Sequence, residues 1–174
     1  MILPFDKSRK QKQQLNEISL KKVLFGGSEQ VDLTEESSIQ ISAGNHKLYI
    51  TKSVDNITPE KARLIGEFIQ FCCKHLGTTQ PCSVYLTGKR GGPITTTASF
   101  NPNNNDIWIY VKNRNMLADP LRSLAHEMRH WKQNLDGVLT EKSGENGSPH
   151  ENEAHAFSGL MIRLFGEIHS EIFI

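Results

Sequence analysis

The stretch best suited to chemistry is His126-Glu127-Met128-Arg129-His130, which fits the pattern H-E-x-x-H. Residues four positions apart on a helix project from one face, about one turn from each other, so His126 and His130 can bind the same metal ion. Glu127, beside the first histidine, then lies near water activated by that metal and can accept its proton. The pattern is short and can occur by chance. Whether it indicates a metal site therefore depends on whether the chain also supplies the remaining ligands.

A catalytic zinc site needs a third protein ligand and one open position for water. Asp136 lies six residues after His130, a spacing that requires the helix to break just after the second histidine, usually at a glycine. Gln133 occupies that position instead. We therefore interpret Asp136 as the solvated end of the helix.

The best candidate for the third ligand is Glu153, in the segment Asn152-Glu153-Ala154-His155-Ala156. Glu153 lies one turn inside a well-capped helix, and the small Ala156 allows that helix to approach the motif helix closely. His155, from the same segment, and His150, from the first turn of the same helix, are alternative ligands. The predicted metal ligands are thus His126, His130 and Glu153, with Glu127 as the catalytic base.

Local signals predict the two helices that carry these residues. Asp119-Pro120 pairs an N-cap residue with proline at the first helical position, and Gly137 ends the motif helix. The final helix begins at Ser148-Pro149-His150-Glu151, with a cap, a proline and a capping-box glutamate. The predicted core face of the motif helix is Leu121, Leu124, Ala125, Met128 and Leu135, and that of the final helix is Phe157, Leu160, Met161 and Leu164.

The region before the motif helix predicts one helix and a three-stranded sheet. The helix runs from its cap at Thr58-Pro59 to Gly77, with apolar residues at helical spacing. Alternating residues predict strands at 82–87, 95–100 and 106–111. The glycine-rich turn at 88–93 lacks the spacing of a phosphate-binding loop. The element order indicates an α+β fold.

Residues 1–55 are interpreted as an N-terminal extension, and residues 56–174 as the main domain. The first 25 residues are basic and favour a solvated helix or arm, with a pro-segment or docking arm as the alternative. Strands are predicted at Ser38–Ser42 and Lys47–Thr51, joined by a turn at Ala43-Gly44-Asn45. The extension is a candidate docking segment for another protein.

The composition of the chain bears on its binding partners, its cysteine chemistry and its cellular location. The 174 residues are 37% apolar with a formal charge of +1, which favours neither nucleic acid nor an anionic membrane as a partner. Three cysteines without C-x-x-C spacing argue against disulfides and a zinc ribbon. No apolar run predicts a signal peptide or a membrane span. We expect a cytoplasmic protein, unless it is packaged into a larger particle.

Taken together, His126-Glu127-x-x-His130 and Asn152-Glu153-x-x-Ala156 resemble the gluzincin metallopeptidases, particularly their minimal single-domain members. The segments 122–127 and 147–154 also resemble small predicted peptidases of tailed bacteriophages. This resemblance covers residues 58–170. It implies a zincin-like fold, a Zn²⁺ ion as cofactor and a protein or peptide as substrate. It also implies phage origin, with residence in the host cytoplasm or in the virion, and a phage or host protein as the partner of the N-terminal extension.

The resemblance also implies roles for neighbouring groups. The strand at 106–111 would bind an extended substrate through its backbone, as the edge strand of gluzincins does. His150, His155 and Tyr110 are candidates to stabilise the oxyanion. Gluzincins often place an acidic residue one turn after the glutamate ligand, and Phe157 occupies that position after Glu153.

Two rival functions follow from the same residues. One is a structural or virion-associated protein that keeps a zinc-binding zincin domain without proteolytic turnover. The intact Glu127 disfavours this hypothesis, since a structural site has no need of a base. The other is a DNA-associated protease of the SprT-like kind, which the missing cysteine ribbon and the near-neutral charge disfavour.

Overall fold

A computed structural model describes residues 37–55, 57–89, 97–112, 116–140 and 142–174. The basic segment 1–25 and most of the glycine-rich turn at 88–93 lie outside the described residues. The helices are α2 (Pro59–Leu76), α3 (Ala118–Leu135) and α4 (Pro149–Ile168), followed by a short 3₁₀ helix at Ser170–Phe173. The strands are β1 (Ser37–Ala43), β2 (His46–Thr51), β3 (Ser83–Thr87), β4 (Ala98–Asn101) and β5 (Asp106–Tyr110). The α+β class predicted from the sequence is confirmed.

The strands form one mixed sheet in the order β1-β2-β3-β5-β4. The two outer pairs, β1 with β2 and β4 with β5, are antiparallel, whereas β2, β3 and β5 run parallel. Within the described residues the sheet therefore has five strands, where the sequence predicted three. The hairpin assigned to the N-terminal extension supplies the additional two, because β2 pairs directly with β3.

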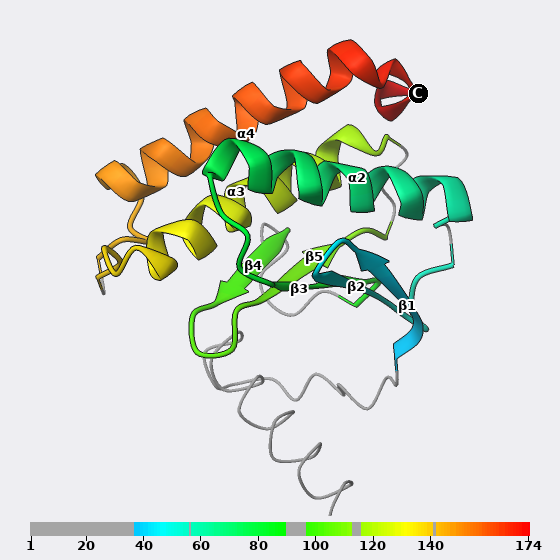
Figure 1. Cartoon of the computed structure of the whole chain (residues 1–174), viewed down its shortest axis with the longest axis horizontal. Helices are drawn as coiled ribbons and strands as arrows, with labels where there is room; N and C mark the ends of the chain where they lie inside the picture. The colour runs from blue at the N-terminus through cyan, green and yellow to red at the C-terminus, as the bar shows by residue number, and fades with distance from the viewer. Residues whose placement is uncertain (1–36, 56, 90–96, 113–115, 141) are drawn as a thin grey trace, which may run out of the picture.

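Alternation along the central strands separates the two faces of the sheet. The side chains of Leu48, Val84 and Ile107 are fully buried and pack under the helices, which Figure 1 shows together on one side of the sheet. The opposite face carries Tyr49, stacked on Tyr85, and Trp108 beyond it. Apolar burial on the helical side supplies the main stabilisation of the fold. None of the described helices is long and apolar enough to cross a membrane.

The order of the strands corrects one expectation. β5 lies between β3 and β4, so the backbone of Asp106–Tyr110 is paired on both sides and cannot bind a substrate strand. Among the described strands, β1 and β4 lie at the two edges of the sheet, and β4 lies beside α3. The tight turn after β4 returns the chain into the sheet interior, which the sequence pattern of the two strands does not reveal.

Two of the predicted helix starts are confirmed and one is wrong. The hydroxyl oxygens of Thr58 and Ser148 accept hydrogen bonds from the amides of Lys61 and Glu151, at 3.2 and 3.1 Å. Asp119 does not cap α3, which begins at Ala118 without a side-chain cap. Asp119 instead lies in the first turn, where a negative charge is favoured by the helix dipole.

The buried face of α4 also differs from the predicted stripe. Leu160, which was expected in the core, is 50% exposed. The buried residues of α4 are Ala154, Ser158, Met161, Ile162 and Phe165. This face is displaced from the predicted one by roughly one residue position, about 100° around the helix. The rotation decides which acidic residue of α4 faces His126 and His130.

The cap of α4 is expected to contribute measurably to stability. Ser148→Ala should lower the free energy of unfolding by about 1–2 kcal/mol, because the hydroxyl caps the helix and also donates to the Ser143 carbonyl at 2.7 Å. Thr58→Ala, which removes a cap without a second hydrogen bond, is the matched control at about 1 kcal/mol. Urea unfolding measures both. A Ser148→Ala loss smaller than that of the control would contradict this account.

Candidate metal site

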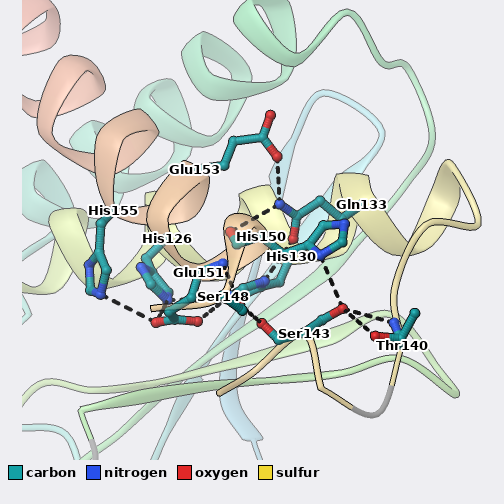
Figure 2. A network of polar contacts seen from close by, with 10 residues as sticks. All are labelled: His126, His130, Gln133, Thr140, Ser143, Ser148, His150, Glu151, Glu153 and His155. Carbon is teal, nitrogen blue, oxygen red and sulfur yellow. Dashed lines mark hydrogen bonds and ion pairs between the residues drawn. The ribbon is translucent and has the colours of Figure 1, made fainter. Parts of the chain in front are cut away.

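Four side chains from two helices lie close together where the first two turns of α4 pack against α3. His126 and His130 come from α3, and Glu151 and His155 come from α4. We call these four residues the histidine–carboxylate cluster, and Figure 2 shows the Glu151 carboxylate among the three imidazoles. Each helix contributes two residues four positions apart, so each pair projects from one helical face.

The distances within the cluster are short. Nε2 of His126 lies 3.1 Å from Oε1 of Glu151, and Nε2 of His130 lies 3.0 Å from Oε2. The two imidazole nitrogens are 3.2 Å apart. Nε2 of His155 is 3.3 Å from Oε1 of Glu151, although the His155 side chain is 68% exposed. His126, Glu151 and His155 can hold a metal ion, since their ligand atoms all lie within 4.8 Å of one another.

The predicted ligands His126 and His130 are therefore brought together, and Glu153 is not. Glu153 is exposed and accepts hydrogen bonds from Arg129 and from the side-chain amide of Gln133. These two hydrogen bonds lower the pKa of its carboxyl. Residues two apart on a helix point about 200° from each other, so Glu151 and Glu153 cannot both face the histidines.

Glu151 is the residue that sequence reasoning missed. Its position three residues after Ser148 suggested a capping-box glutamate. This local role gave no indication that the side chain contacts the neighbouring helix. Ser148 does cap the helix, but the Glu151 side chain points to the histidines. The available signal was the pair Glu151 and His155, four positions apart, with small Ala154 between them on the buried face.

Glu127 lies on the wall of a pocket of about 350 Å³ beside the cluster. Burial, together with the nearby Glu151 charge, raises the pKa of the Glu127 carboxyl to about 8, while a hydrogen bond from the Phe100 amide opposes the shift. The remaining lining residues come from α3, α4 and the segment at the start of β4: Thr97, Ala98, Arg122, Ser123, His126, Glu151, His155 and Ser158.

Burial also acts on His126. It lowers the pKa of His126 to about 4, against the opposing charge of Glu151. His126 is therefore neutral near pH 7, the state in which an imidazole binds metal. A neutral imidazole and a carboxylate provide ligand atoms of the type that zinc accepts.

The other residues proposed from the sequence lie away from this pocket. Nδ1 of His150 lies 3.2 Å from the Ser143 hydroxyl, in a loop network that supports the start of α4. Tyr110 is on β5, and neither His150 nor Tyr110 lines the pocket. Asp136 forms an ion pair with Lys132 at the end of α3. Of the three candidate oxyanion donors, only His155 belongs to the cluster and lines the pocket.

Comparison with protein-family models, with curated proteins and with solved structures finds no match to this chain.

Burying Glu127 should make the stability of the metal-free protein depend on pH. The pKa of the Glu127 carboxyl is about 4.5 in the unfolded chain and about 8 in the folded protein. The contribution of Glu127 to stability is therefore fully present below about pH 4.5, where the carboxyl is protonated in both states. It is lost as the pH rises through about 8. Glu127→Gln should therefore be more stable than wild type by about 1–3 kcal/mol near pH 9 and nearly equal to it near pH 4–5.

Urea unfolding in the presence of a chelator, repeated across this pH range, measures the effect. The substituted glutamine retains an oxygen that can accept from the Phe100 amide, so the comparison isolates the charge. Glu145→Gln, at an exposed loop position, controls for the loss of one negative charge. A stability difference that does not change with pH would show that Glu127 is not the titrating group.

Proposed function

We propose that this chain is a zinc-dependent peptidase of gluzincin type, with His126, His130 and Glu151 as metal ligands and Glu127 as the base. One observation carries the proposal: Nε2 of each histidine and the Glu151 carboxylate lie 3.0–3.2 Å from one another. Ligand atoms bound tetrahedrally to zinc at about 2.0–2.1 Å are about 3.3 Å apart. The three side chains thus already have nearly the spacing that a shared zinc ion requires.

The chemistry of the donors agrees with this proposal. Two imidazoles and one carboxylate form a donor set found at catalytic zinc sites, which leave a fourth position open. Bound there, zinc would polarise the scissile carbonyl and lower the pKa of water. The pocket beside Glu127 provides the space in which a substrate carbonyl could meet that water.

Glu127 is suited to move the proton. Its carboxyl follows His126 directly in α3, lines the pocket, and is held by the Phe100 amide. In the proposed reaction it accepts a proton from the attacking water and delivers it to the leaving amine. A positive ion at the neighbouring cluster would favour the ionised form of Glu127 that this step requires.

The pocket also contains groups suited to bind substrate. β4 is an edge strand next to the pocket, so an extended peptide could pair with its backbone near Ala98. His155 can donate a hydrogen bond to the developing oxyanion. We assign the substrate strand to β4 in place of β5, whose backbone is already paired on both sides.

A second candidate function is a zinc-binding structural or virion-associated domain without turnover. The position of His155 favours this structural alternative, because its Nε2 lies only 3.3 Å from the Glu151 carboxylate. If His155 joined the other three ligands, the metal would have four protein ligands and no open position, as in structural zinc sites. In that case His155→Ala would remove one of the four ligands and open a position on the metal. In a peptidase, His155→Ala would leave the zinc bound and would lower turnover.

The peptidase proposal predicts that Glu127→Gln binds zinc as wild type does and loses at least about 100-fold in turnover, the scale of a general base. Bound metal is measured by elemental analysis, and cleavage is followed with casein and a fluorogenic peptide library. Zinc bound by wild type with no cleavage of any substrate would favour the structural alternative. Failure to bind zinc at micromolar free concentration would exclude both.

The ligand assignment predicts different results at the two acidic residues of α4. Glu151→Gln should weaken zinc binding by at least about 100-fold, since it removes a charged ligand. Glu153→Gln should change it by less than about tenfold, because the new amide oxygen can still accept from Gln133. Competition titrations with a chromogenic chelator measure both. The reverse order of effects would restore Glu153 as the ligand.

A further inference from the structure

Gln133 is a buried polar residue of α3, almost one turn after His130, and is 1% exposed. Both ends of its side-chain amide are hydrogen bonded. Nε2 donates to the carbonyl oxygen of His150 at 3.1 Å and to the Glu153 carboxylate at 2.8 Å. Oε1 lies 2.9 Å from Nδ1 of His130. This amide connects the cluster to the first turn of α4.

The partners of the amide determine its orientation. A carbonyl oxygen and a carboxylate can only accept hydrogen bonds, so the NH₂ group of Gln133 must face His150 and Glu153. Its oxygen must then face His130. Because that oxygen is only an acceptor, Nδ1 of His130 must carry a hydrogen.

This hydrogen leaves Nε2 of neutral His130 as an unprotonated nitrogen with a free lone pair. The lone pair faces the cluster, where Nε2 lies 3.0 Å from Oε2 of Glu151 and 3.2 Å from Nε2 of His126. Two acceptors at 3.0 Å repel each other unless a cation or a proton lies between them. The tautomer imposed from Nδ1 is therefore the one that a metal ion needs at Nε2.

We propose that Gln133 is a positioning residue that holds His130 in the Nδ1–H tautomer, with Nε2 ready to bind metal. Glu153 holds the Gln133 amide in its orientation, and Arg129 holds Glu153 through an ion pair. The inference rests on the proposed function only in taking His130 as a metal ligand. It gives Glu153 a role two contacts away from His130.

Gln133 also connects α3 to α4, so a purely structural role must be separated from control of the tautomer. Asn134 offers a matched control, because its side-chain amide also donates from α3 to another element, the carbonyl of Pro102, at 3.1 Å. Asn134→Leu removes that hydrogen bond without altering the contacts of His130. Gln133→Met removes the polar atoms and keeps the length of the side chain.

Nitrogen NMR of the histidine rings tests the tautomer directly in the metal-free protein at about pH 8, where imidazole is ordinarily neutral. In wild type, His130 should show a protonated Nδ1 and an unprotonated Nε2. In Gln133→Met, the two tautomers should mix, and Asn134→Leu should retain the wild-type pattern. A wild-type His130 protonated at Nε2 would overturn the proposal, even if the Gln133→Met variant does not fold.

Zinc titration provides the second readout. Gln133→Met should bind zinc about 10–100-fold more weakly than wild type, the usual effect of losing a partner of a metal-bound histidine. Asn134→Leu should stay within about threefold of wild type. Equal weakening in both variants, or no weakening in Gln133→Met, would leave Gln133 with a structural role only. Wild type that binds zinc and cleaves nothing would refute the peptidase while leaving this inference intact.

Discussion

The site depends on the packing of the first two turns of α4 against the second half of α3. Both the cluster and the Gln133 amide lie at this contact, so a small shift of α4 would separate their groups on α3 from their partners on α4. The start of α4 is held in place by the Ser148 cap and by the hydrogen bonds of the Ser143 loop that precedes the helix. A partly buried carboxylate at such a contact is costly unless its oxygens are paired. The imidazoles provide those partners, and a metal ion would provide a stronger one.

The buried carboxyl of Glu127 is costly for the stability of the fold. A carboxyl with a pKa of about 8, beside the carboxylate of Glu151, is an unfavourable feature for a structure that only needs to be stable. Perturbed acids of this kind are concentrated at catalytic sites, although structural networks also contain them. The continuous apolar core between the sheet and the helices provides the stability that allows it.

Local features of this protein could be predicted from the sequence because they depend on neighbouring residues. Alternation identified every described strand to within a few residues, and caps followed by proline located the starts of α2 and α4. The spacing of His126 and His130 placed both imidazoles on one face, because helical geometry alone requires it. The prediction at Asp119 failed since an acidic residue suits both the cap and the first turn.

Features that depend on distant segments required the tertiary structure. The order of β4 and β5, and the membership of the β1–β2 hairpin in the same sheet, follow from pairing partners far apart in the chain. The sequence by itself determined that two histidines share one helical face with an acid beside the first. Only the packing of α4 decided that Glu151 meets them and Glu153 does not. A rotation of about 100° would turn Glu151 away from the histidines, and more than one face of that helix carries the apolar side chains that could pack.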